Sequence, residues 1–68
     1  MGDANRVMFI LSQFGEMSIY GFRDKLNLSK EEVTKIVKLL EKEGLVWTDS
    51  KSYSLSTTVY LTNKGREF

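Results

Sequence analysis

Four polar residues fall on one face of a predicted helix, and their types suit contact with nucleic acid. The spacing i, i+3, i+4 and i+7 places on that face Glu31, Thr34, Lys35 and Lys38. Lysine can donate to phosphates or guanine edges, threonine can contact phosphate or a thymine methyl, and glutamate can accept from cytosine N4. Ser29, Lys30 and the amides of the first turn would meet phosphates at the start of the helix. These residues predict a helix that reads double-stranded DNA.

The same face also fits a helix that is only hydrated. Residues 29–43 carry four lysines and four glutamates, so this stretch has no net charge. Glu31 and Lys35 form an i, i+4 pair in the favourable order, and such balanced faces are typical of soluble helices. The whole chain has a net charge of +1, far from that of a protein that binds nucleic acid by charge alone. Charge therefore leaves both interpretations open.

A second polar set lies in the hydroxyl-rich stretch 50–57. Its candidate DNA contacts are Ser50, Lys51, Ser52 and Tyr53. The hydroxyls and the lysine could donate to phosphates, and a loop of this kind can lie along the minor groove. The alternative is a plain hairpin loop, in which serine is simply a favoured residue. Tyr53 is expected to be exposed near the tip, whereas Trp47 is expected to pack in the core or the wing.

Several classes of chemistry have no residues to support them. Histidine and cysteine are both absent, which removes the usual metal ligands, the usual general base and the thiolate nucleophile. The chain has no glycine-rich phosphate loop and no nucleophile elbow, so we predict neither an enzyme nor a bound cofactor or metal. Apolar runs are too short for a membrane span and no signal-peptide pattern is present, which predicts a cytoplasmic protein.

The N-terminal part predicts a helix over residues 4–14. Asp3 or Asn5 could cap its start, and Gly15 ends it. One apolar stripe at helical spacing would face the core: Val7, Ile10, Leu11 and Phe14. Phe9 falls on the opposite side, where it is either covered by the C-terminal segment or part of a partner surface. We predict that Phe9 contributes to a homodimer contact.

Two further helices follow, separated by a tight turn. Ser18 opens the second helix, and the three residues "NLS" lead into the third. The apolar positions of the second helix are Ile19, Phe22 and Leu26. Ser29 and Glu32 form an S-x-x-E capping box at the start of the third helix, and Gly44 is placed to end it in a left-handed conformation. The apolar stripe of the third helix is Val33, Ile36, Val37 and Leu40.

The sequence after Gly44 changes to the twofold period of strands. Four apolar or aromatic residues stand at alternating positions: Leu45, Trp47, Val59 and Leu61. A two-stranded hairpin is unstable alone and must pack on the helices, while Thr62 could cap a last helical turn. One or two extended residues are expected around Met17. The predicted fold is α+β and mostly α, one domain over residues 1–68 in which a three-helix core carries a β-hairpin wing: a winged helix-turn-helix.

Residues 18–46, "SIYGFRDKLNLSKEEVTKIVKLLEKEGLV", are similar without a gap to the core of MarR-type and PadR-type winged-helix regulators of bacteria and archaea. "LEKEGLV" at residues 40–46 resembles the end of their long helix, and "YLTNKGREF" at residues 60–68 resembles the end of their wing. "YG" at residues 20–21 is closer to the PadR type. The resemblance implies transcription regulation by a homodimer, with the third helix in the major groove of DNA and the wing on the backbone or in the minor groove.

Two differences from those families bear on function. Full-length members carry extra helices for dimerisation, for which this chain has no room, and their wing tips often bear arginine where this chain has only Lys51. Folds of this shape also serve as protein docking units. The balanced charge of the third helix and the surplus aromatic Phe9 fit that alternative, a winged-helix interaction module without DNA binding.

Overall fold

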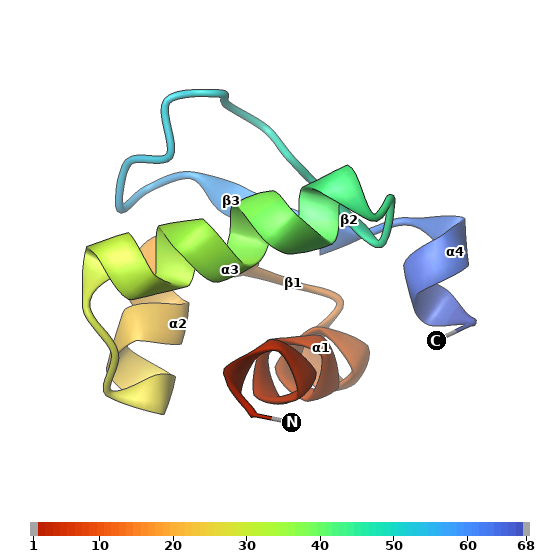
Figure 1. Ribbon diagram of the computed structural model, residues 1–68, viewed down its shortest axis with the longest axis horizontal. Coiled ribbons are helices and arrows are strands. Elements are labelled where there is room, and N and C mark those ends of the chain that lie inside the picture. Colours follow the sequence, from red (N-terminus) through yellow and green to blue (C-terminus); the bar gives the residue numbers. More distant parts are fainter. Residues whose placement is uncertain (1, 68) are drawn as a thin grey trace.

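The computed structural model describes residues 2–67, which form helices and a few short strands (Figure 1). The elements in order are α1 (Asp3–Phe14), β1 (Glu16–Ser18), α2 (Ile19–Leu26), α3 (Lys30–Lys42), β2 (Val46–Thr48), β3 (Thr58–Leu61) and α4 (Asn63–Arg66). A tight turn joins α2 to α3 and a hairpin follows α3, which confirms the predicted winged helix-turn-helix. In Figure 1, α1 and α2 lie below α3, and the long β2–β3 loop arches above it.

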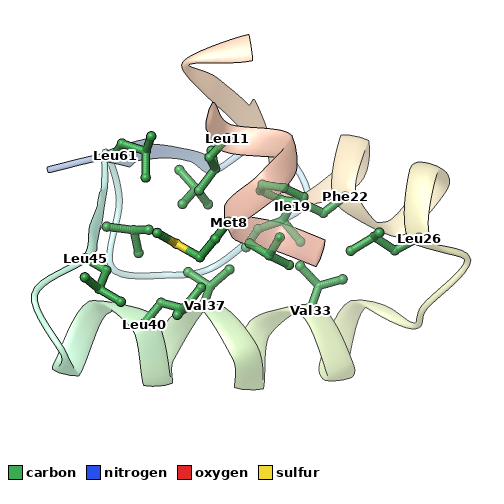
Figure 2. Close-up of a cluster of buried hydrophobic side chains, with 13 residues drawn as sticks. Met8, Leu11, Ile19, Phe22, Leu26, Val33, Val37, Leu40, Leu45 and Leu61 are labelled. Carbon is green, nitrogen blue, oxygen red and sulfur yellow. The ribbon is translucent and has the colours of Figure 1, made fainter. Parts of the chain in front are cut away.

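One hydrophobic core joins α1, α2 and α3 to the hairpin (Figure 2). Its buried side chains come from α1 (Val7, Met8 and Leu11), α2 (Ile19, Phe22 and Leu26), α3 (Val33, Val37 and Leu40) and the strand region (Leu45, Val46, Val59 and Leu61). Burying one large apolar side chain contributes about 1.5–3 kcal/mol. This cluster is therefore the main source of the folding free energy, and it fixes which face of α3 stays outside.

Phe14 lies outside this core, contrary to the prediction from its spacing. Its side chain is 59% exposed, and Met8 is the further α1 residue that is buried. Gly15 follows directly with a φ of 84°, so the chain leaves the helix at the point where Phe14 would pack. The Phe14 ring instead lies near Lys25, whose ammonium group is 5.2 Å from the ring centroid.

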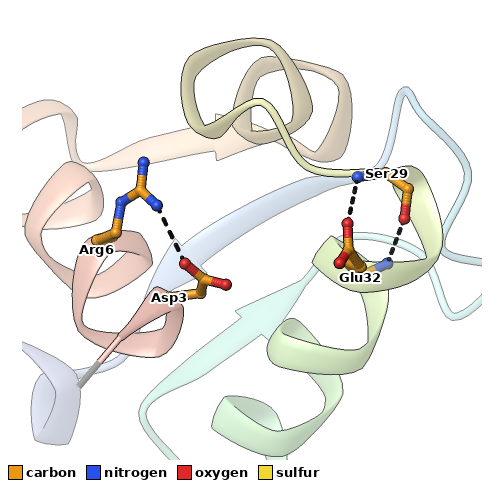
Figure 3. A network of polar contacts seen from close by, with 4 residues as sticks. All are labelled: Asp3, Arg6, Ser29 and Glu32. Atoms are coloured by element: carbon orange, nitrogen blue, oxygen red, sulfur yellow. Dashed lines mark hydrogen bonds and ion pairs between the residues drawn. The ribbon is translucent and has the colours of Figure 1, made fainter.

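The start of α1 also differs from the prediction. Gly2 occupies the N-cap position and no side chain caps the helix, so neither Asp3 nor Asn5 has the predicted role. Asp3 lies inside the first turn, where its negative charge is favourable beside the unpaired amides of the helix end. Its carboxylate pairs with Arg6 at 3.1 Å, as Figure 3 shows.

The starts of α2 and α3 are capped as predicted. The Ser18 hydroxyl accepts from the Gly21 N–H at 3.0 Å. At α3 the Ser29 hydroxyl accepts from the Glu32 N–H at 3.1 Å, and the Glu32 carboxylate accepts from the Ser29 N–H at 2.9 Å (Figure 3). Asn27, in the turn between the two helices, has a left-handed φ of 58°. These bonds fix where α3 begins and hence which of its residues face outward.

The strands form an antiparallel sheet in the order β1-β3-β2, which is one strand more than predicted. Val59 of β3 pairs with Met17 on one side and with Thr48 on the other. The extended residues expected around Met17 are present, but their pairing was missed because β1 has only three residues and its partner is distant in the sequence. Strand β1 thereby connects the wing to the segment that leads into α2.

The residues that β2 turns inward differ from the predicted alternation. Leu45 and Val46 are both buried, whereas Trp47 is 49% exposed. The Leu45 N–H still donates to the Leu40 carbonyl at the end of α3, so strand alternation begins only at Val46. Trp47 stacks on Tyr60 of β3 with ring centroids 4.3 Å apart. Trp47 therefore packs within the wing, on the outer face of the sheet, and not in the core.

The short C-terminal helix α4 and its cap are hydrogen-bonded to the end of α3. Thr62 caps α4 as predicted, because its hydroxyl accepts from the Gly65 N–H at 2.9 Å. The same hydroxyl donates to the Gly44 carbonyl at 2.6 Å, and Gly44 has the predicted left-handed φ, 80°. The Lys64 ammonium group donates to the Glu43 carbonyl at 3.0 Å. Carbonyl groups at the end of α3 thus find their donors on α4.

Gly65 brings the two motifs of the sequence into direct contact. A Cβ at this position would overlap the Leu45 carbonyl oxygen and lie 2.9 Å from Leu61 Cδ2, so only glycine fits. Leu45 belongs to "LEKEGLV" and Gly65 to "YLTNKGREF", so the two motifs pack directly against each other. Phe68, which ends the second motif, lies outside the described residues.

Candidate nucleic-acid interface

A groove of about 440 Å³ runs between the outer side of α3 and the β2–β3 loop, and we call it the wing groove. Its lining consists of Lys30, Glu31, Thr34, Lys35, Lys38, Lys51, Ser52 and Tyr53. These are eight of the ten residues predicted from the sequence to contact DNA. The fold brings the two sets together because the loop arches back along α3 (Figure 1).

Ser29 and Ser50, the other two predicted contacts, do not line the wing groove. The Ser29 hydroxyl is engaged in the capping box. The Ser50 hydroxyl accepts from the Ser52 N–H at 3.2 Å and lies 2.8 Å from the Ser52 hydroxyl. Both side chains therefore shape local structure, Ser29 at the start of α3 and Ser50 within the loop.

The charges of α3 are sorted between its faces, although residues 29–43 sum to zero. The groove lining holds four lysines, three from α3 and one from the loop, against the single glutamate Glu31, for a formal charge of +3. Glu32 is turned toward the helix start by the capping box, and Glu41 accepts a hydrogen bond from Tyr53 of the wing loop. Local structure thus produces a basic groove from a neutral stretch of sequence.

The groove lysines have no acidic partner in the structure. Within residues 2–67 the only side-chain ion pair joins Asp3 to Arg6, so the predicted pair of Glu31 and Lys35 is not formed. Exposed pairs at this spacing gain little in water, which explains why proximity in sequence does not produce a salt bridge. The ammonium groups are consequently available to an anionic ligand.

Tyr53 is half-buried and not exposed as predicted. Its hydroxyl donates to the Glu41 carboxylate, and the Lys38 ammonium group lies 5.2 Å from the centroid of its ring. Burial, the hydrogen bond to Glu41 and the charge of that carboxylate together raise the pKa of Tyr53 to about 12. The role of Glu41 could not be predicted from the sequence, because its partner Tyr53 lies in another element and no local pattern links the two residues.

The wing loop is tied to α2 as well as to α3. The Ile19 N–H, in the first turn of α2, donates to the Thr57 carbonyl at 2.9 Å. Thr57 is buried, and its hydroxyl accepts from the Ser54 N–H at 3.0 Å. Thr57 was also missed from the sequence, although it continues the inward alternation of Val59 and Leu61, a signal that could have found it.

Thr34 carries an unsatisfied polar atom. Its Oγ1 is buried and is the one such side-chain atom in residues 2–67 that makes no hydrogen bond. Leaving a buried hydroxyl without a partner costs about 1–3 kcal/mol. Thr34 also lines the wing groove, so this unpaired hydroxyl lies in a residue at the border of the basic surface.

A second exposed feature lies on α1. Phe9 is 63% exposed on the side away from the core, as its spacing predicts. It lines two hollows of about 310 and 350 Å³, and Asn5 lines both with it. The other lining residues are Met8, Ser12, Gly65 and Arg66 in one hollow and Arg6, Ile10 and Leu26 in the other. The C-terminal segment therefore borders this face but leaves Phe9 uncovered.

Neither a metal site nor a membrane span accompanies these surfaces in the described part of the chain. Residues 2–67 hold no group of three histidine, cysteine, aspartate or glutamate side chains that could bind a metal ion. In the same range no helix has the length and apolar character needed to cross a membrane.

The fold and the wing groove define a class of protein. An exposed second helix of a helix-turn-helix, flanked by the loop of a β-hairpin, is the winged helix-turn-helix architecture. The family model that matches is the MarR family, over residues 5–47, which is more than half of the chain. The chain therefore belongs to the MarR family, and the matched range runs from α1 through α3 to β2.

Two solved structures share this fold. The transcriptional regulator homologue protein from Pyrococcus horikoshii OT3 has a TM-score of 0.82 and 23% sequence identity, over 94% of this chain and 65% of that chain. The heme sensor protein PefR from Streptococcus agalactiae, in complex with heme, has a TM-score of 0.81 and 25% identity, over 97% of this chain and 47% of that chain. This chain thus spans less than two-thirds of either protein. The search of curated proteins found no match.

Proposed function

We propose that this protein is a cytoplasmic transcriptional regulator that binds double-stranded DNA sequence-specifically. Helix α3 would enter the major groove, and the wing loop would lie on the backbone or in the adjacent minor groove. The observation that carries the proposal is the wing groove, where lysines of α3 and of the loop share a formal charge of +3. Membership of the MarR family supports the same function.

The groove residues divide into two kinds of contact. Phosphate contacts would come from Lys30, Lys51 and the Ser52 hydroxyl. Base contacts would come from Lys35 or Lys38 at guanine and from Glu31 at cytosine N4. Thr34 would contact a thymine methyl or a phosphate.

The test is an NMR titration of isotopically labelled protein with a mixed-sequence duplex, at low and then moderate salt. Shifts should concentrate at residues 30–38 and 50–54 and be reversed by salt, because phosphate binding releases counterions. Lys30→Gln and Lys51→Gln should each lower the slope of log K against log salt by about 1. The matched control is Lys25→Gln, which removes a lysine beside Phe14 and outside the groove. Absence of shifts at low salt would contradict DNA binding.

We also propose a homodimer formed through Phe9. Folds of this kind usually read specific sites as two-fold dimers on two half-sites, which doubles the phosphate contacts. The exposed Phe9 ring and the hollow that it forms with Ile10 and Leu26 offer a surface that a second copy could fill. In sedimentation equilibrium, Phe9→Ser should be monomeric at concentrations where the wild type dimerises. The equally exposed Phe14 supplies the control, Phe14→Ser, which should dimerise normally.

A winged-helix interaction module without DNA binding is the second candidate. The exposed Phe9 and the zero net charge of residues 29–43 favour it. It predicts no duplex binding near physiological salt and a protein partner on α1 or on the wing. Tight, site-specific binding of the isolated chain to duplex DNA would remove this candidate.

A further inference from the structure

Tyr53 connects the wing loop to α3 through its side chain. Its phenol has one hydrogen to donate, and Glu41 accepts it, so this hydroxyl cannot also donate to a phosphate. Its backbone adopts a left-handed φ of 51°, which is uncommon for a residue other than glycine. The side-chain contacts must therefore outweigh an unfavourable backbone conformation. A direct contact with DNA, predicted from the sequence, does not account for this arrangement.

The other half of the connection is Glu41. It lies in the same row of α3 as Lys38, three residues earlier, and Thr34, seven residues earlier. Tyr53 binds one of its carboxylate oxygens, and the Thr48 hydroxyl lies 3.4 Å from the other. Glu41 does not line the wing groove, whereas Tyr53 does. The Thr48 hydroxyl has one hydrogen and donates it to the Ser50 carbonyl at 2.9 Å, so the neutral donor of the wing that engages Glu41 is Tyr53.

We propose that Tyr53 is a positioning residue of the DNA-binding surface, an inference that rests on the proposed function. Its bond to Glu41 and its contact with Lys38 hold the loop beside α3, so that Lys51 and the lysines of α3 face one groove. If Tyr53 does not hold the loop, Lys51 is no longer fixed beside the lysines of α3, and the two sets of lysines contact phosphates independently. The hydroxyl of Tyr53 therefore acts on DNA only through the position of the loop.

The first measurement follows the loop without DNA. Backbone order parameters of residues 51–54, from ¹⁵N relaxation, should fall from about 0.85 toward 0.6 in Tyr53→Phe, because the loop loses its bond to a charged acceptor. The matched control, Tyr20→Phe, removes a hydroxyl from an exposed tyrosine of α2 and should leave the loop unchanged. The order parameter of the buried Val37 reports that the fold is intact. Equal loop order in wild type and Tyr53→Phe would overturn the proposal.

The second measurement asks whether Tyr53 acts through Glu41. Glu41→Ala should loosen the loop as Tyr53→Phe does, and the double variant should be no looser than either single variant, because one bond is lost in all three. Glu41→Gln keeps an acceptor for the phenol and should restore most of the loop order. Additive effects of the two substitutions would show that they act separately and would overturn the proposal.

The third measurement adds the duplex. Tyr53→Phe should weaken binding roughly 3- to 10-fold at moderate salt and lower the salt slope by about 1, since Lys51 no longer binds together with α3. A looser loop with unchanged affinity and slope would overturn the positioning role. A wild-type protein that binds no duplex at low salt would refute the proposed function and the DNA part of this inference. The order parameters would still decide whether Tyr53 holds the loop.

Discussion

Helix α3 is held differently at its C-terminal end and along its wing-facing side. At the C-terminal end, Thr62 and Lys64 donate to free carbonyls and Gly65 packs on the Leu45 carbonyl without space for a side chain. Along the wing-facing side, Thr34 has a buried hydroxyl without a partner, and the wing groove carries an excess of lysine. The first contact is complete within the chain. The wing-facing side leaves lysines without acidic partners, to which an anionic ligand can bind, and such unpaired polar groups are typical of functional sites.

The largest effect should come from Gly65→Ala at the C-terminal end. The new Cβ would overlap the Leu45 carbonyl oxygen. Because this oxygen belongs to the backbone, it cannot shift as a flexible side chain could. We expect a loss of about 3 kcal/mol in the free energy of unfolding, measured by urea denaturation. Gly15→Ala is the control, because Gly15 has a φ of 84° but a Cβ added there would meet no atom within 4 Å, and it should cost only about 1 kcal/mol. If both variants lose the same free energy of unfolding, the backbone near Gly65 must shift and remove the overlap.

Thr62→Ala should have the next largest effect. It removes the cap of α4 and the bond to the Gly44 carbonyl, so the free energy of unfolding should fall by about 1–2 kcal/mol. Ser50→Ala, which removes a hydroxyl from the wing loop, should change it by less than about 0.5 kcal/mol. If the two variants unfold at the same urea concentration, the hydrogen bonds of Thr62 contribute no more to stability than those of Ser50, contrary to this prediction.

Thr34→Val should have opposite effects on stability and on binding. Replacing an unsatisfied buried hydroxyl by a methyl group should raise the free energy of unfolding by about 1 kcal/mol. The same change should weaken duplex binding, because the hydroxyl that would meet a phosphate is lost. Thr34→Ser keeps the hydroxyl and serves as the control for binding. A Thr34→Val protein that is less stable than the wild type would mean that the hydroxyl already has a partner in the free protein.

High pH should weaken the wing-facing side by a smaller amount. The pKa of Tyr53 is about 12 in the folded protein against 10.0 for the free side chain, so folding favours the neutral phenol. This contribution is fully present below pH 10 and is lost as the pH rises through 12. The free energy of unfolding should therefore fall more steeply over this range in the wild type than in Tyr53→Phe. Parallel curves from urea titrations would count against the bond to Glu41.

The helices could be predicted from the sequence because local signals set their ends. Ser18, Ser29 and Gly44 take the predicted caps, and the stripe of α3 faces the core. The error falls where an element stops, because Phe14 directly precedes the turn at Gly15. Periodicity assumes that an element continues, so it assigns the wrong face to the residues at its ends.

The candidate site was only partly predictable, for a different physical reason. The outward residues of α3 follow from helical spacing, but a sum of charge over the helix cannot show that Glu32 is used in the capping box and that Glu41 binds Tyr53. The contact of Tyr53 with Glu41 and the pairing of β1 with β3 join segments distant in the chain. Such contacts depend on the assembled fold and leave no local pattern to find.

Trp47 has a practical consequence because it is the only tryptophan of the chain. It is half exposed, stacks on Tyr60 and lies in the strand from which the wing loop departs. The protein therefore carries an intrinsic fluorophore on its wing. A ligand that disturbs the stack of Trp47 on Tyr60, or that changes the access of solvent to the indole, will alter the wavelength or intensity of the tryptophan emission. Movements of the wing can therefore be followed by fluorescence without attaching a dye.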